Sequence, residues 1–117
     1  MPKDCSKKPD MNSTILLEDG SSIKIPKKVI KSKQVGEVVI VLTDSEVGNK
    51  INNENVYCYD FNGKELWQIE DLNLFHEKHD YTSIYFLESE LYIYNRCGVE
   101  VKINPESGKV LSTELIR

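Results

Sequence analysis

Short runs of alternating hydrophobic and polar residues cover most of the chain, and they predict β-strands rather than helices. One pattern occurs twice. An apolar strand ends at Asp or Asn, the chain turns, and a second apolar run begins after Gly-Lys. The first copy is 56–67 and the second is 99–111. Repetition of such a unit indicates an array of similar β-hairpins.

The first half of the chain predicts one hairpin and one central strand. Ile15-Leu16-Leu17 and Ile23-Lys24-Ile25 flank Asp19-Gly20, which is a strong turn signal. Either a two-residue or a three-residue loop fits. Residues 26–36 read as a lysine-rich connection. Residues 38–42 (Val-Val-Ile-Val-Leu) form a continuous β-branched run, which predicts a strand covered on both faces.

The first repeat predicts a hairpin that follows a polar loop at 44–55. A two-residue Asn62-Gly63 loop would pair Cys58 with Trp67. One face would then carry Val56, Cys58, Trp67 and Ile69, and the other would carry Tyr57, Tyr59 and Leu66. We expect the first face to lie in the core, because Trp67 is the largest apolar side chain in the protein.

The second half predicts further strands. Residues 70–78 depart from the strand pattern and suggest one short helix within 70–79. The runs 84–87 and 91–94 flank Glu88-Ser89-Glu90 and predict a hairpin. Residues 99–103 alternate as a half-buried strand, and a turn at 104–108 leads into a last strand that ends at 116.

The two copies resemble the repeats of quinoprotein-type (PQQ-like) β-propellers. The first copy matches at Asp60, Gly63, Lys64 and Trp67. The second matches at Asn104, Gly108 and Lys109, but Leu111 stands where a Trp would be expected. The resemblance covers residues 38–117 and extends to small stand-alone bacterial proteins of this repeat type. It implies repeats at about 38–71 and 82–117.

The expected fold class is all-β: antiparallel hairpins stacked as two small sheets, like an incomplete propeller, with at most one short helix. Residues 13–117 would form a single domain after a disordered tail at 1–12. A closed propeller needs ~4–8 blades, so two repeats are too few to enclose a quinone. We therefore expect no cofactor.

Charge is unevenly distributed. Residues 1–36 hold eight Lys/Arg against four Asp/Glu, whereas residues 37–117 hold seven against fifteen. The acidic part argues against a nucleic-acid partner and favours a basic protein partner. No apolar run approaches the ~18 residues of a membrane helix, so we expect no membrane contact. The N-terminus does not resemble a signal peptide, and three widely spaced cysteines fit a reducing cytoplasm.

Both histidines lie in one short segment, at His76 and His79. On a helical turn they would share a face and could bind zinc, but a structural zinc site has four ligands, and no closing cysteine pair is present. We expect no metal. Cys97 and the histidines lack a recognisable nucleophile motif, so catalysis is not favoured.

All six tyrosines lie between residues 57 and 94. Tyr57/Tyr59 and Tyr92/Tyr94 are i, i+2 pairs, so each pair lies on one face of a strand. Exposed tyrosines near acidic residues are typical of protein interfaces. The candidate binding residues are Tyr57, Tyr59, Tyr92, Tyr94, His76, Tyr81 and Asn95.

Three functional hypotheses remain open. The favoured one is a non-enzymatic binding protein, in its sharpest form an immunity-type inhibitor that caps a basic bacterial toxin. The second is a ligand-binding or enzymatic module that uses the His76–Tyr81 segment and the Asn95–Gly98 turn. The third is a structural module that pairs with itself as a homodimer, because exposed strand edges invite pairing.

Overall fold

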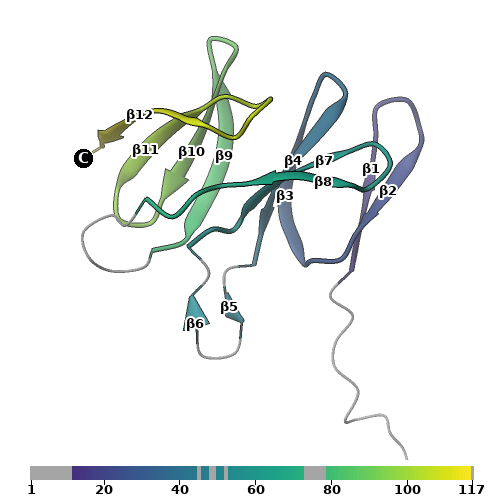
Figure 1. The fold of residues 1–117 in the computed structure, drawn as a ribbon, viewed down its shortest axis with the longest axis horizontal. Helices are drawn as coiled ribbons and strands as arrows, with labels where there is room; N and C mark the ends of the chain where they lie inside the picture. The colour runs from purple at the N-terminus through teal and green to yellow at the C-terminus, as the bar shows by residue number, and fades with distance from the viewer. Residues whose placement is uncertain (1–11, 45, 48–49, 52, 73–78, 117) are drawn as a thin grey trace, which may run out of the picture.

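The computed structural model describes residues 12–44, 46–47, 50–51, 53–72 and 79–116. These residues form β-strands and no helix (Figure 1). The strands are β1 (Ser13–Leu16), β2 (Ser22–Ile25), β3 (Val29–Val35), β4 (Val38–Thr43), β5 (Glu46–Val47), β6 (Lys50–Ile51), β7 (Val56–Asp60), β8 (Glu65–Gln68), β9 (Tyr81–Leu87), β10 (Glu90–Asn95), β11 (Val99–Ile103) and β12 (Val110–Leu115).

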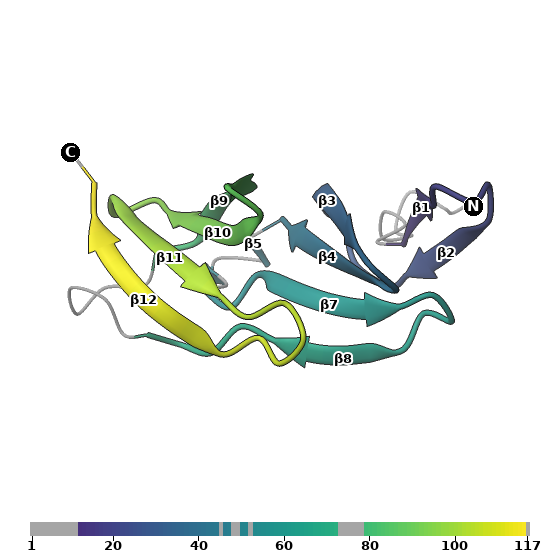
Figure 2. The same ribbon diagram turned by 90° about the horizontal axis from the view of Figure 1, so that it is seen from above.

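Three antiparallel units follow one another along the molecule. The N-terminal hairpin is β1-β2, the central sheet has the order β3-β4-β7-β8, and the C-terminal sheet has the order β12-β11-β10-β9. The short β5-β6 pair forms a fourth, minor unit. Figure 2 shows the three main units side by side. The expected all-β class of stacked antiparallel hairpins is confirmed.

Two hydrophobic cores lie on opposite faces of the central sheet. The larger core joins the central and C-terminal sheets and contains Ile40, Leu42, Val56, Cys58, Ile69, Tyr81, Ile84, Leu91, Ile93, Val99, Val101 and Ile103. The smaller core joins the central sheet to the N-terminal hairpin and contains Leu17, Ile23, Ile25, Val39, Val41, Tyr57 and Tyr59. Strand β4 contributes alternate residues to both cores, so the prediction of a strand covered on both faces is confirmed.

The β7-β8 hairpin has a three-residue loop, and the predicted two-residue loop is wrong. The Asp60 and Lys64 residues close the loop, because the Asp60 N–H donates to the Lys64 carbonyl oxygen at 2.9 Å. Gly63 has a φ of 85°, which glycine adopts without the steric cost that a side chain imposes. A two-residue type I′ loop would also require a positive φ at Asn62, but among the described non-glycine residues only Glu88 and Ser89 have one, so the hairpin takes the longer loop.

A β-bulge corrects the register after this loop. Tyr59 pairs with Glu65, but Cys58 pairs with Trp67, so one residue of β8 is left out of the ladder. Cys58 lies in the larger core and Trp67 packs against it. The predicted core face is therefore confirmed, although the loop that was expected to produce it is different.

Two other segments bear on the predictions: residues 26–36, where the prediction is wrong, and the loop of the N-terminal hairpin, where the structure selects one of two predicted lengths. The supposed connection at 26–36 contains β3, which pairs with β4 along its length. The N-terminal hairpin has the three-residue loop, because the Leu17 N–H donates to the Ser21 carbonyl oxygen at 2.7 Å. Most of the expected helix, residues 73–78, and all but one residue of the expected tail lie outside the described residues.

The described sheets do not close around an axis. The central and C-terminal sheets pack face to face, and the N-terminal hairpin covers the far face of the central sheet. A propeller would need these units to continue into a closed ring. The arrangement gives no support to quinoprotein-type repeats.

Candidate functional site

The predicted tyrosines do not form one surface. Tyr57 and Tyr59 are only 7% and 2% exposed, because the N-terminal hairpin covers them. The expectation that they contribute to an exposed interface is therefore not met. The sequence pattern could not reveal this, because tyrosine suits both a buried and an open sheet face.

A lysine from the supposed connection accompanies the buried pair. The Lys27 Nζ lies 4.5 Å from the Tyr57 ring centroid and 5.5 Å from that of Tyr59. It also donates to the Tyr59 hydroxyl oxygen at 2.8 Å and to the Glu65 carboxylate at 3.3 Å. Partial burial works to lower the pKa of Lys27, but these partners raise it overall. Lys27 therefore has a structural role that sequence reasoning missed.

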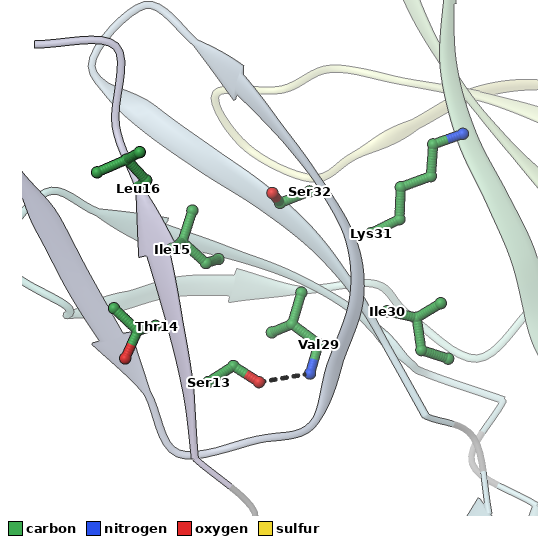
Figure 3. Close-up of a pocket in the computed structure, with 8 residues that line it drawn as sticks. All are labelled: Ser13, Thr14, Ile15, Leu16, Val29, Ile30, Lys31 and Ser32. Carbon is green, nitrogen blue, oxygen red and sulfur yellow. Dashed lines mark hydrogen bonds between the residues drawn. The ribbon is translucent and has the colours of Figure 1, made fainter. Parts of the chain in front are cut away.

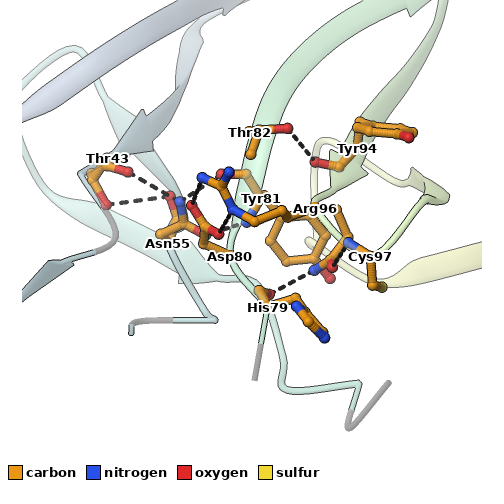
Figure 4. A network of polar contacts seen from close by, with 10 residues as sticks. Thr43, Asn55, His79, Asp80, Tyr81, Thr82, Tyr94, Arg96 and Cys97 are labelled. Atoms are coloured by element: carbon orange, nitrogen blue, oxygen red, sulfur yellow. Dashed lines mark hydrogen bonds and ion pairs between the residues drawn. The ribbon is translucent and has the colours of Figure 1, made fainter. Parts of the chain in front are cut away.

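The described part of the predicted His76–Tyr81 segment, residues 79–81, meets the predicted Asn95–Gly98 turn at one end of the C-terminal sheet (Figure 4). The Asn95 side-chain nitrogen donates to the His79 carbonyl oxygen at 2.7 Å. Arg96 forms a bidentate ion pair with the buried Asp80, at 2.7 and 3.1 Å. His76 lies outside the described residues. The sequence thus identified two segments that the fold brings into contact.

Asn55 extends this network to the central sheet. Its side-chain nitrogen donates to the Thr43 and Tyr81 carbonyl oxygens at 3.0 and 2.9 Å, and its oxygen accepts from the Tyr81 N–H at 2.9 Å. Asn55 is 1% exposed, so these bonds satisfy a buried amide. Sequence reasoning missed Asn55, because its main partner is far away along the chain.

This polar network connects secondary-structure elements and offers little reactive chemistry. Tyr81 and Asn95 are each 2% exposed, and burial raises the pKa of Tyr81 to about 12. The Asp80 carboxylate is engaged by Arg96. Within the described part of the chain, no three His, Cys, Asp or Glu side chains converge as metal ligands would.

The outer face of the C-terminal sheet is the open tyrosine surface. Tyr85 of β9 pairs with Tyr92 of β10, and their rings stack with centroids 6.0 Å apart and planes 15° apart. Tyr94 lies on the same face two residues along β10. All three side chains are half-buried. We call this surface the tyrosine face; by the strand register it comprises Ser83, Tyr85, Leu87, Glu90, Tyr92, Tyr94, Glu100, Lys102, Ser112 and Glu114.

Acidic residues surround these rings. Glu100 lies directly opposite Tyr94 and accepts a hydrogen bond from the Tyr85 hydroxyl. Glu114 lies opposite Glu100 on β12. Lys102 is the one basic residue of the tyrosine face, and it forms an ion pair with Glu90 at 3.5 Å. Three carboxylates against one ammonium leave a net negative charge, as the uneven charge distribution led us to expect.

Desolvation and the hydrogen bond to Glu100 keep Tyr85 in its neutral form. Its pKa is raised well above the ordinary value, first by desolvation and then by the hydrogen bond and charge of Glu100. Tyr85 was absent from the predicted binding residues, because it is not part of an i, i+2 pair. Its cross-strand pairing with Tyr92 became visible only with the register.

A groove of about 470 Å³ lies elsewhere, between β1 and β3 (Figure 3). Ser13–Leu16 and Val29–Ser32 line it, and the Ser13 hydroxyl oxygen accepts from the Val29 N–H at 2.9 Å at one end. None of the predicted binding residues lines this groove. The groove therefore adds nothing to the candidate site on the tyrosine face.

Comparison with known families gives one finding. The model of a family described as Domain of unknown function (DUF7957) matches residues 7–115, so the chain belongs to this family. A search of curated proteins found no match. The family that matches is not described as one of quinoprotein repeats, and the described sheets form no propeller, so the prediction of quinoprotein-type repeats is wrong. The described residues include no helix that could span a membrane.

Proposed function

We propose that this DUF7957 member is a non-enzymatic binding protein that uses its tyrosine face to bind a basic protein. The observation that carries the proposal is the row of three half-buried tyrosines among glutamates, in which Tyr85 stacks on Tyr92 and donates a hydrogen bond to Glu100. Rigid aromatic side chains lose little conformational entropy on binding and frequently dominate interface energies. The surrounding carboxylates would attract a cationic partner.

The buried tyrosine pair supports this proposal by showing how the same residue types hold a lysine. Lys27 lies over Tyr57 and Tyr59 and bonds to Glu65 on the adjacent strand. The tyrosine face has a comparable set, with Tyr92 and Tyr94 on one strand and Glu100 on the next. A lysine or arginine of the partner would find aromatic faces and a carboxylate in a similar arrangement.

In its sharpest form, the proposal is that the protein is an immunity-type inhibitor that caps a basic bacterial toxin. The polar network around Asp80 favours no competing catalytic role, because its groups are occupied by hydrogen bonds and an ion pair. If the inhibitor form is correct, adding the purified protein should abolish the activity of the captured partner.

The test compares variants as baits for capture from a lysate of the native host. Wild-type protein should retain a basic protein at low salt, and capture should fall steeply as salt rises, because charge steering is screened over ~8–10 Å. With that partner purified, calorimetry should show that Tyr92→Ala or Tyr94→Ala weakens binding by about 2 kcal/mol, roughly thirtyfold.

Two controls separate recognition from folding. Tyr92→Phe keeps the ring and should bind almost as wild type does, whereas Leu16→Ala alters a 76% exposed residue of the N-terminal hairpin and should change nothing. Thermal unfolding should confirm that each variant is folded. Equal capture by wild type and Tyr94→Ala, an acidic partner, or turnover of a small molecule would each contradict the proposal.

A further inference from the structure

Strand β12 is an exposed sheet edge. Its partner strand β11 buries Val99, Val101 and Ile103, but every residue from 111 to 116 is exposed. Leu111, Leu115 and Ile116 are 53%, 44% and 39% exposed. Among the described residues, β12 pairs with β11 alone. Its outer edge therefore presents backbone groups that another strand can bind.

This edge has few of the features by which strand edges usually resist pairing: it carries one charged side chain, Glu114, and one bulge, at Leu111. Edge strand β3 carries Lys31 and Lys33 and is bulged near its start. Residues 110–116 (Val-Leu-Ser-Thr-Glu-Leu-Ile) contain no lysine and no proline. The register shift of β12 falls before Ser112, so the ladder from 112 to 115 is regular. Such an edge is suited to association.

Backbone alternation identifies the residues that would pair. The Ile116 N–H donates to the Gly98 carbonyl oxygen on the β11 side at 2.7 Å. In an antiparallel ladder every second residue bonds to the same neighbour, so Glu114 and Ser112 also face β11. The N–H and C=O groups of Thr113 and Leu115 therefore point away from the sheet.

We propose that β12 pairs antiparallel with β12 of a second copy of the chain, with Thr113 opposite Thr113. This register keeps the regular part of β12 at the centre, with Glu114 opposite Ser112, and it sets Leu115 opposite Leu111, the residue that the bulge leaves out of the ladder to β11. A shift by two residues in one direction would set Glu114 against Glu114, and a shift in the other would set Val110 against Glu114. Only the central register pairs apolar residues and avoids a direct clash of like charges.

The pairing makes one continuous eight-stranded sheet from two C-terminal sheets. The two-fold axis is perpendicular to this sheet, so both tyrosine faces lie on the same side. A single strand pair buries less than the ~800 Å² per partner of a standard interface, so the dimer should be weak and concentration-dependent. This inference does not depend on the proposed function.

The test is sedimentation velocity of the purified chain from 10 µM to about 1 mM, a range chosen for a weak dimer. Wild type should shift from monomer to dimer, and salt should not weaken the dimer, in contrast to a charge-steered partner. Thr113→Pro removes an outward N–H without breaking the bonds to β11, and it should remain monomeric. Thr14→Pro makes the same change at the β1 edge and should leave the dimer intact.

Cross-linking tests the register independently and does not rely on a folded proline variant. In a background of Cys5→Ser and Cys97→Ser, Thr113→Cys should give a disulfide-linked dimer under mild oxidation, and Ser112→Cys should give far less. Wild type that stays monomeric throughout the range, a dimer unaffected by Thr113→Pro, or equal cross-linking at both positions would overturn the proposal.

Discussion

At the scale of single residues, Asn55 connects two sheets. Its one side chain forms three hydrogen bonds to backbone groups of Thr43 and Tyr81. Two of them involve the first residue of β9, so they fix where the C-terminal sheet begins relative to the central sheet. A buried amide contributes this specificity only when its groups are satisfied, as they are here. From sequence, Asn55 reads as one polar loop residue among several.

Cys58 provides a prediction about alkaline pH. Burial raises the pKa of the Cys58 thiol from 9.0 to about 12. Because the folded-state pKa lies above the unfolded value, the thiol contributes full stability below pH 9 and loses it as pH rises toward 12. The free energy of unfolding should therefore decline over this window, by at most about 1.4 kcal/mol per pH unit for one proton.

Urea unfolding at a series of pH values from 7 to 11 measures this decline. Cys58→Ala should be less stable than wild type at neutral pH, because it leaves a small cavity in the larger core. The decline between pH 9 and 11 should nevertheless be shallower in that variant. Parallel curves for the two proteins would show that other groups, such as Tyr59 and Tyr81, account for the alkaline loss.

At the scale of elements, a turn of the C-terminal sheet packs against β8 of the central sheet. The Trp67 indole N–H donates to the Pro105 carbonyl oxygen at 2.9 Å. Gly108 has a φ of 74°, and a Cβ atom there would lie 2.4 Å from Trp67 Cδ2. Glycine at this position thus serves two purposes, the left-handed turn and the close approach of the indole.

Gly108→Ala should lower the free energy of unfolding by ~2–4 kcal/mol, from the left-handed conformation and the displaced indole together. In a Trp67→Ala background there is no indole to displace. Gly108→Ala should then lower the free energy of unfolding only by the cost of the left-handed backbone conformation, ~1–2 kcal/mol. Urea unfolding followed by circular dichroism gives all four values of this double-mutant cycle. Additive effects would mean that the turn shifts away from Trp67 at no cost.

The sequence predicted where most strands lie better than it predicted how the strands and sheets pack together. Alternation located most strands, and the pairing of Cys58 with Trp67 was correct although the loop was one residue longer, because the bulge compensated. Strand β3 was missed, because its lysines hide the apolar pattern of an edge strand. The burial of Tyr57 depended on which unit covers that face of the central sheet, and this information is tertiary.

At the scale of the whole molecule, the central sheet belongs to two cores at once. Val39 and Val41 of β4 face the N-terminal hairpin, while Ile40 and Leu42 face the C-terminal sheet. The hairpin alone is too small to be stable, because an isolated two-stranded unit is marginal in water. Loss of the hairpin would expose one face of β4 and weaken the sheet that carries the other core.

This shared sheet predicts that the described units unfold as one cooperative structure. Ile25 is fully buried in the smaller core, and Ile25→Ala should cost ~2–4 kcal/mol. The single tryptophan, Trp67, packs against the larger core and reports on the opposite side of the central sheet. Its fluorescence midpoint in urea should therefore fall together with the circular dichroism midpoint, and by the same amount.

The matched control is Ile30→Ala, at a residue 62% exposed on β3, which should shift neither midpoint. If Ile25→Ala produced an early circular dichroism change that left Trp67 fluorescence unaltered, the two cores would be independent, and the N-terminal hairpin would be an appendage rather than part of the cooperative fold.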